Sequence, residues 1–477
     1  EPGPTDPTVL ATTTTSTITP AQLLTVVVID DQGGPVAGAK VGTAGETGPD
    51  GRITFERRSA PMAITADGFV PRFVDEGPGD TMTVSLQPIV VEGTVETTNG
   101  KPYPHVAVTL GGVATMTDES GRFRFSGRQA GTLRVDIPGR RSVEYDWLGR
   151  QSFVKLTVDP IVVRAVHVTG WAVANAELWS HLLGLADETE LNSLVVDLKD
   201  ESGRVFYPSE VALASEVGAA GDEYQLVDVV ETVRSHDLYL IGRIVTFQDP
   251  IAARAAPDIA IWNSATNAPF RKGSQYFLDP TDPNARQYAL DLAAEACEAG
   301  FDEIQFDYVR YPDGFGSSAV FDGGADNGTR AGVIRDFLAE ATAILRPSGC
   351  AVAADIFGFI TSTLGDGGIG QQLEELETVV DVLSPMLYPS HYSEGWFGFA
   401  VPNDHPGPVI ANALDDGLDR LSSVVVMRPW IQDFYYSDAQ VRAEIDAAEE
   451  RGLGWMLWNA LSRFAEGALK PVPAEGS

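Results

Sequence analysis

After Pro160 the sequence alternates between short apolar segments typical of strands and longer segments typical of helices. Eight strand-like segments occur, and each of the first seven is followed by a helical one. Their ranges are 162–171, 191–200, 238–245, 301–312, 350–357, 382–388, 424–430 and 454–459. This order predicts an α/β fold, a (β/α)8 barrel, with a doubly wound sheet as the alternative. Thr169-Gly170-Trp171-Ala172 follows the first strand in place of a Gly-rich phosphate turn, which favours the barrel.

The region before the barrel contains short strands separated by turns, and its pattern occurs twice. The turn at 49–51 precedes the strand 52–55, just as the turn at 118–121 precedes the strand 122–125. Asp-Gly and Ser-Gly turns between alternating strands are typical of hairpins, so we predict two small all-β sandwiches of Ig-like or prealbumin-like type. The predicted domains are a flexible tether at 1–20, sandwiches at 21–88 and 89–160, and the barrel at 161–470.

Composition limits the class of partner. A net charge of -34 argues against binding to nucleic acid, because the phosphates would be repelled. No apolar run is long enough to cross a bilayer. No pattern of metal ligands or cofactor motif is present, so no cofactor is expected. Neutral glycans are compatible with this charge.

Two features bear on the compartment. Cys297 lies near the end of a predicted helix and Cys350 at the start of a predicted strand, and we expect two buried, unpaired thiols rather than a bridge. The chain begins at Glu1, without methionine, in a Pro- and Thr-rich segment. This start predicts a secreted or cell-surface protein whose signal peptide has been removed.

The strand at 301–312 ends in a cluster of charge, with Asp307 and Arg310 just before Pro312. Barrel enzymes keep their chemistry at the carboxyl ends of the strands, so we expect the polar residues at all eight strand ends to meet at one mouth. The predicted substrate-binding residues are Asp197, Lys199, Arg243, Arg310, Tyr388, His391, Arg428, Gln432, Asp433, Trp458 and Asn459.

Carboxylates together with tryptophans and tyrosines indicate a glycosidase, in which two acids do the chemistry and flat rings stack on sugars. We predict Asp307 as nucleophile and Asp355 as the acid that protonates the leaving oxygen. Neighbouring strand ends would bring these carboxyls to the roughly 5–5.5 Å gap of retaining enzymes. Asp433 is the alternative second acid.

Three resemblances accompany this interpretation. Residues 194–200 and 301–312 resemble a bacterial glycoside-hydrolase-like family of unknown function, over roughly 162–465, with Phe306-Asp307-Tyr308-Val309-Arg310-Tyr311-Pro312 as the most specific run. The resemblance implies a barrel distantly related to the α-amylase group, a nucleophile on strand 4 and an acid on strand 5. Each β-rich repeat resembles the carboxypeptidase-regulatory-like module, through 35–41 and 50–55 in the first copy.

Strand 4 is also similar to the family 18 chitinase signature, with Asp302, Gln305 and Asp307 on its acidic positions. Val309 stands where chitinases have the catalytic glutamate, so chitinase chemistry is disfavoured. A polysaccharide deacetylase would need a His/Asp metal set that the six scattered histidines do not suggest.

We therefore predict a secreted hydrolase acting on an α-linked polysaccharide or oligosaccharide. The alternative is a non-catalytic carbohydrate-binding or cell-wall scaffold protein on a similar barrel, with cell-wall association through the N-terminal modules.

Overall fold

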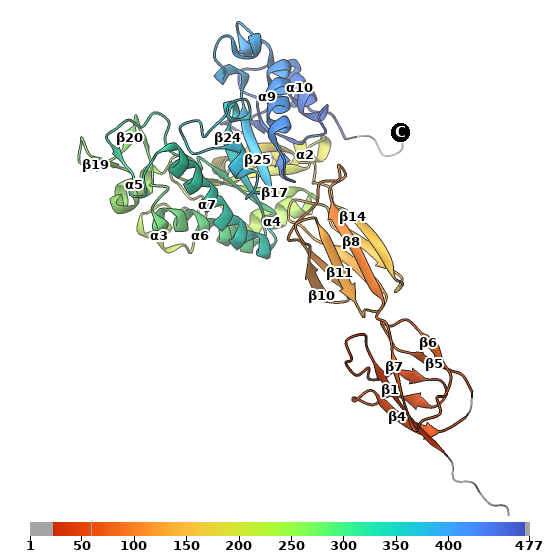
Figure 1. Cartoon of the computed structure of the whole chain (residues 1–477). Coiled ribbons are helices and arrows are strands. Elements are labelled where there is room, and N and C mark those ends of the chain that lie inside the picture. Colours follow the sequence, from red (N-terminus) through yellow and green to blue (C-terminus); the bar gives the residue numbers. More distant parts are fainter. Residues whose placement is uncertain (1–21, 59, 473–477) are drawn as a thin grey trace, which may run out of the picture. The chain divides into compact units, whose positions relative to one another are not determined.

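The computed structural model describes residues 22–58 and 60–472 of the 477-residue chain. The tether predicted for 1–20 lies outside these residues. The chain forms two compact units, and each is described by itself (Figure 1). The first unit holds the β-rich segments up to Leu156, apart from 96–103 and 136–142, which belong with the barrel in the second unit.

The β-rich region is a repeat of one sandwich-like arrangement, as predicted. The first copy has sheets β4-β1-β7 and β3-β2-β5-β6, and the second has β11-β8-β14 and β10-β9-β12-β13, so the strand orders correspond one to one. Alternate residues of β1 and β5 enter the core of the first copy, as the period of two requires. The strands are β1 Leu23–Ile29, β2 Lys40–Val41, β3 Gly45–Glu46, β4 Arg52–Glu56, β5 Met62–Thr65, β6 Arg72–Val74, β7 Thr81–Ser85, β8 Val90–Glu96, β9 Ala107–Leu110, β10 Val113–Met116, β11 Arg122–Ser126, β12 Gly131–Val135, β13 Val143–Trp147 and β14 Ser152–Thr157.

The second unit is the predicted eight-stranded parallel barrel. Its sheet runs β24-β22-β17-β16-β15-β28-β27-β25, and pairing between β24 and β25 closes it. The seventh position is split into β26 and β27 around Arg428 and Pro429. The strands are β15 Arg164–Val168, β16 Ser193–Lys199, β17 Tyr239–Val245, β22 Glu303–Asp307, β24 Ala351–Phe357, β25 Val382–Leu387, β26 Val426–Met427, β27 Trp430–Gln432 and β28 Trp455–Trp458.

Helices cover the outside of the barrel (Figure 1). The large apolar core lies between strands and helices, and a smaller cluster that includes Trp430 and Met456 contributes to the interior. The helices are α1 Gly170–Ala174, α2 Ala176–Glu188, α3 Ala212–Glu216, α4 Leu226–Ser235, α5 Pro250–Ala255, α6 Pro283–Ala299, α7 Asn327–Leu345, α8 Leu373–Leu376, α9 Pro406–Arg420 and α10 Asp438–Glu449. Short strands in the loops are β18 Trp262–Asn263, β19 Ala268–Pro269, β20 Arg271–Lys272, β21 Gln275–Tyr276 and β23 Ala319–Val320.

Local signals place the central strand β22. The Asp282 side chain accepts hydrogen bonds from two backbone amides at the start of α6, and Gly300 ends this helix in the left-handed conformation at φ 112°. Glu303, Gln305 and Asp307 then alternate toward the barrel interior. Gln305 reaches Ser384 of β25, the next strand but one in the ring, with its Nε2 donating to Oγ at 3.1 Å. One strand therefore provides polar groups at three levels of the interior.

The prediction of two unpaired thiols is wrong. Cys297 at the end of α6 and Cys350 next to β24 form a disulfide, with their Cα atoms 6.0 Å apart. The two residues are 53 positions apart in sequence but meet because β22, which follows α6, pairs with β24. Helix–strand periodicity alone does not show this pairing of neighbouring elements.

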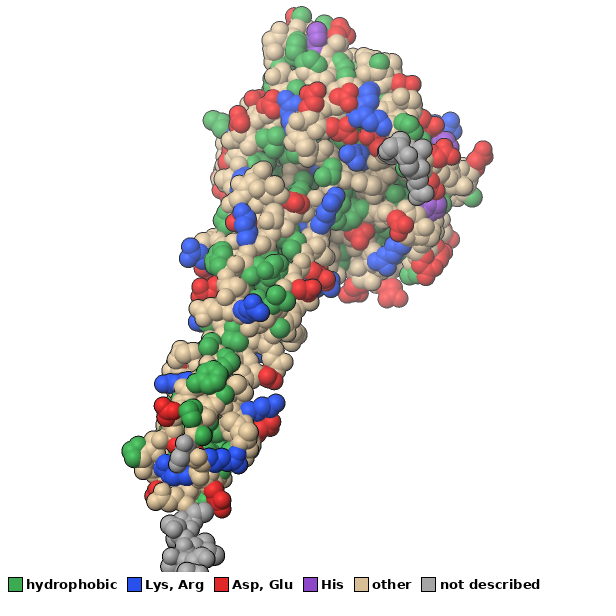
Figure 2. All heavy atoms as spheres, turned by 90° about the vertical axis from the view of Figure 1, so that its right-hand side faces the viewer, with side chains coloured by type: hydrophobic (Ala, Val, Ile, Leu, Met, Phe, Trp, Pro, Cys, Tyr) green, Lys and Arg blue, Asp and Glu red, His purple; other side chains and the backbone are tan. Residues whose placement is uncertain are grey.

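One face of the molecule shows how charged side chains are distributed on it. On the face in Figure 2, acidic and basic side chains are interspersed, and no basic patch gathers there. Among the described residues, no helix is both long and apolar enough to span a membrane.

Candidate active site

The carboxyl ends of the barrel strands deliver side chains to one cavity, which we call the cup. β22 ends at Asp307 and β28 at Trp458, while Tyr388 directly follows β25. The volume of about 600 Å³ suits a ligand of one or a few sugar rings. The cup is lined by Glu201, Arg243, Asp307, Tyr308, Arg310, Phe357, Gly358, Phe359, Met386, Tyr388, His391, Tyr392, Ser393, Trp396, Trp430 and Trp458.

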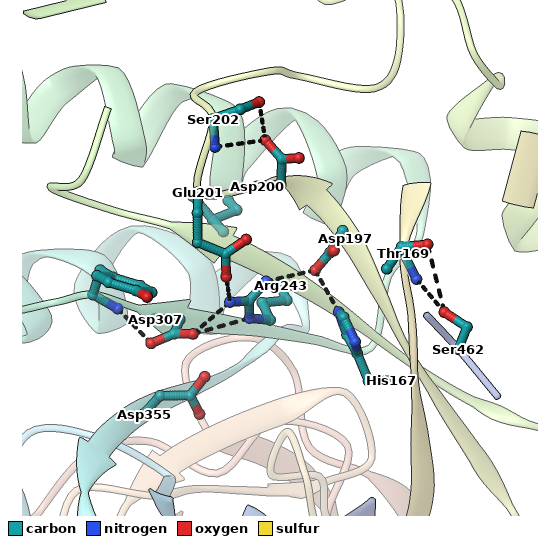
Figure 3. A network of polar contacts seen from close by, with 12 residues as sticks. His167, Thr169, Asp197, Asp200, Glu201, Ser202, Arg243, Asp307, Asp355 and Ser462 are labelled. Atoms are coloured by element: carbon teal, nitrogen blue, oxygen red, sulfur yellow. Dashed lines mark hydrogen bonds and ion pairs between the residues drawn. The ribbon is translucent and has the colours of Figure 1, made fainter. Parts of the chain in front are cut away.

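Arg243 of β17 is the centre of the polar network beneath the cup (Figure 3). Its Nη1 donates to Asp197 Oδ1 at 2.7 Å, and its Nη2 donates to Asp307 Oδ2 at 2.6 Å and to Glu201 Oε1 at 2.5 Å. The Trp458 ring lies against the guanidinium, 4.7 Å from Cζ to the ring centroid. Burial alone would lower the pKa of Arg243, but the three carboxylates raise it well above its usual value.

Asp307 is fixed on both of its oxygens. Oδ2 accepts from Arg243, and Oδ1 accepts from the backbone N–H of Tyr308 at 2.6 Å. Tyr308 adopts a left-handed backbone at φ 48°, a conformation that costs a non-glycine residue roughly 1–2 kcal/mol. Strain of this kind collects at functional sites, and here it turns the amide toward the carboxylate and the ring toward the cup.

Asp355 of β24 lies near Asp307 but does not line the cup. It is fully buried, its Oδ1 accepts from Trp430 Nε1 at 2.9 Å, and its Oδ2 has no hydrogen-bond partner. Burial first, and then the charge of Asp307, raise the pKa of Asp355 well above its usual value. The protonated form is therefore favoured.

The structure divides the predicted site residues into two groups. Those that line the cup are Asp307, Arg243, Arg310, Tyr388, His391 and Trp458. Those that do not are Asp355, Asp197, Lys199, Gln432, Asp433, Asn459 and Arg428.

Several residues of the second group organise the cup from below. Asp197 accepts from His167 Nε2 at 3.0 Å and from Arg243. Gln432 Oε1 accepts from both the amide and the hydroxyl of Ser390, which holds the loop after β25.

Asp433 ties down the loop after β28. It accepts from Ala465 N at 2.9 Å and from Asn459 Nδ2 at 3.3 Å, and burial raises its pKa to about 6. Asp433 and Asn459 therefore hold the loop rather than face the cup.

Lys199 was expected at the mouth, but it lies outside the barrel interior. A register shift between Asp197 and Lys199 marks a bulge in β16, which changes the direction of the side chains that follow. The Lys199 ammonium pairs with Asp249 at 2.9 Å and lies over the Tyr288 ring of α6. This lysine is therefore buried between strand and helix.

Arg428 was also expected at the mouth, and it lies near the other end of the barrel. Met427 pairs with Leu383, the second residue of β25, so Arg428 belongs to the amino-terminal part of its strand. Its guanidinium forms a buried ion pair with Glu303, the first residue of β22. The seventh position starts and ends two residues later than predicted, at 426–432 in place of 424–430, so Arg428 lies well before its carboxyl end.

Sequence reasoning missed Glu201 and the aromatic wall of the cup. Glu201 lies in the loop after β16, where no periodicity predicts a direction, although it adjoins the charged run that ends at Asp200. Tyr392 and Trp396 belong to the loop after β25, whose density of rings between 388 and 399 was a usable signal.

The described residues were also compared with the ligand sets that metal ions need. Within residues 22–58 and 60–472, no group of three or more His, Cys, Asp or Glu side chains is arranged to hold a metal ion.

A parallel barrel with acids and aromatic rings at its mouth is an arrangement that glycosidases use. Residues 165–464 match the family described as "Putative glycosyl hydrolase domain", and the chain belongs to this family. No protein of curated function matches the sequence.

Solved structures are similar over parts of the chain. A hypothetical protein from Ruminiclostridium thermocellum is 35% identical, with 40% of this chain and 96% of that chain covered and a TM-score of 0.37. The PgaB (BpsB) glycoside hydrolase domain from Bordetella bronchiseptica is 14% identical, with 63% and 94% covered and a TM-score of 0.46. The α-galactosidase TtGalA from Thermus thermophilus is 13% identical, with 74% and 77% covered and a TM-score of 0.41.

Proposed function

We propose that this protein is a secreted glycoside hydrolase that cleaves an α-linked polysaccharide in two steps, with retention of anomeric configuration. Asp307 is the nucleophile. The observation that carries the proposal is its placement: both oxygens are fixed, by Arg243 and by the Tyr308 amide, at the floor of the cup. A carboxylate held in one orientation beneath the space for a sugar ring is positioned to attack the anomeric carbon.

The rest of the cup supports a carbohydrate substrate. Eight aromatic rings line it, and such rings stack against the apolar faces of sugars while the polar groups bind hydroxyls. The α-linkage rests on the resemblance of residues 194–200 and 301–312 to a family whose barrel is distantly related to the α-amylase group. The eight rings are those of Tyr308, Phe357, Phe359, Tyr388, Tyr392, Trp396, Trp430 and Trp458.

Export is supported by the disulfide between Cys297 and Cys350, because structural disulfides persist mainly in oxidising compartments. The test is to express the complete natural gene and to assay the culture medium, the cell wall and the cytosol for the protein. Recovery from the cytosol alone would contradict export.

The test of activity is a panel of bacterial and plant polysaccharides, with released sugars read by mass spectrometry. We expect the parent protein to release sugars from at least one polymer and Asp307→Asn to release none while still binding that polymer. Binding by the parent protein without hydrolysis of any polymer would favour the scaffold alternative. Matched phenyl α- and β-glycosides then test the linkage.

A further inference from the structure

The inference below rests on the proposed hydrolysis. In that reaction a second carboxyl group protonates the leaving oxygen, so it has to face the substrate. Asp355 does not meet this requirement, because it is fully buried and its Oδ2 is enclosed. Among the described residues that line the cup, Glu201 is the carboxyl that accompanies Asp307. Its side chain is 37% exposed, whereas that of Asp307 is 5% exposed.

We infer that Glu201 is the acid/base catalyst of this site. Glu201 Oε1 and Asp307 Oδ2 accept from the same atom, Arg243 Nη2, at 2.5 and 2.6 Å. The distance between the two oxygens therefore cannot exceed the sum of these two hydrogen-bond distances. This upper limit does not exceed the roughly 5–5.5 Å separation of the carboxyls in retaining glycosidases.

The charges around Arg243 bear on how Glu201 can carry the proton that it gives to the leaving oxygen. Three carboxylates surround the guanidinium: Asp197, Glu201 and Asp307. His167 lies beside this network: its Nδ1 faces the Asn459 carbonyl at 3.1 Å and its Nε2 faces Asp197 at 3.0 Å. One guanidinium does not neutralise three carboxylates, so a proton on Glu201, the carboxyl most open to the cup, reduces the excess of negative charge.

The reaction then keeps the charge of the network constant. In the first step the Asp307 carboxylate forms a bond to the anomeric carbon, the bond from that carbon to the leaving oxygen breaks, and the Glu201 proton passes to that oxygen. In the second step the Glu201 carboxylate takes a proton from water, the water oxygen bonds to the anomeric carbon, and the bond to Asp307 breaks. Arg243 contacts both acids, so it is paired with whichever carries the charge.

The first experiment compares leaving groups in Glu201→Gln. The probes are α-glycosyl fluorides of glucose, galactose and N-acetylgalactosamine, with the matching phenyl α-glycosides. Fluoride leaves without a proton, so we expect kcat/KM of the variant to stay within about tenfold of the parent on the fluoride and to fall about 10²–10⁴-fold on the phenyl glycoside. A merely structural role for Glu201 would lower both rates by the same factor.

The second experiment adds sodium azide. Azide takes the place of water in Glu201→Gln, where no base is needed, so we expect the turnover of the fluoride to rise and an α-glycosyl azide to form. In Asp307→Asn the azide attacks directly and the product is the β-glycosyl azide. The two acids are thereby distinguished by the configuration of the product.

The matched control is Glu223→Gln, since Glu223 pairs with Arg204 in the same inter-strand region but does not line the cup. Glu201→Asp is the second variant, in case Glu201→Gln fails to fold, and the same dependence on leaving group is expected. Equal loss on both probes, or no loss on either, overturns the assignment of Glu201. A parent protein that cleaves none of these probes and releases no sugar from any polymer of the panel overturns the proposed hydrolase, and the role of Glu201 with it.

Discussion

The two ends of the barrel each contain a buried arginine, but their partners differ. Near the amino-terminal end, Arg428 makes a two-point ion pair with Glu303, with side chains that are 3% and 1% exposed. At the mouth, Arg243 is shared by three carboxylates, and one of them, Glu201, is open to the cup. One arginine is thus paired with one carboxylate at the amino-terminal end, whereas one arginine is paired with three carboxylates at the mouth.

This difference separates structural from functional use of buried charge. In a balanced pair, removal of either partner leaves an unpaired ion and destabilises the fold. In the network at the mouth, three carboxylates share one guanidinium, so removal of one carboxylate relieves repulsion. The loss is then expected in the catalytic rate rather than in stability. Both kinds of residue lie on β22, which begins with Glu303 and ends with Asp307.

The largest expected effect is that of Asp307→Asn on turnover. We expect kcat to fall by about 10⁴-fold or more, because the nucleophile is removed. The free energy of unfolding at pH 7 should stay equal or rise by up to about 1 kcal/mol. Urea unfolding and a kinetic assay on the same preparation check both values. A marked loss of stability would contradict the view that three carboxylates around Arg243 are more than one guanidinium neutralises.

The matched change at the other end is Glu303→Gln. It leaves the Arg428 guanidinium buried without an anion, so we expect a loss of roughly 3 kcal/mol in unfolding free energy, with kcat of the folded protein unchanged. The double variant Glu303→Met/Arg428→Met removes both charges and should recover most of the loss. If the double variant is no more stable than Glu303→Gln, the pair is not balanced as described.

A smaller effect is expected in the pH dependence of stability. Burial raises the pKa of Asp433 to about 6 from an unfolded value near 4, so folding favours its protonated form. Its contribution is fully present below about pH 4 and is lost as pH rises through about 6, by about 1–3 kcal/mol. Asp433→Asn should flatten the curve of unfolding free energy over this range. An unchanged slope would show that Asp433 titrates normally.

The smallest effect is expected for Asp355→Asn. The amide keeps an oxygen acceptor for Trp430 Nε1, and it replaces a carboxyl whose raised pKa favours the neutral form. We expect stability at pH 7 to change by about 1 kcal/mol or less and kcat/KM on a phenyl α-glycoside to change by less than about tenfold. A drop of 10²-fold or more, absent on the fluoride, would make Asp355 the acid in place of Glu201.

The sequence was sufficient to predict the barrel and the place of Asp307, because eight apolar strands alternate with helices and β22 ends in charge before a proline. It was insufficient where the direction of a side chain depends on how its strand pairs with the neighbouring strands. The bulge after Asp197 turns Lys199 out of the interior, and the split seventh strand puts Arg428 at the wrong end for a substrate contact. Glu201 lies in a loop, where hydrophobic periodicity carries no information on orientation.

The disulfide has a practical consequence for every measurement on this protein. It joins the helix that leads into β22 to the next strand of the ring, and closure of its 53-residue interval adds about 4 kcal/mol by chain-entropy reasoning. Material made in the reducing cytosol of an expression host and material matured in an oxidising compartment would thus be chemically different samples. The choice of host sets the baseline against which each variant is compared.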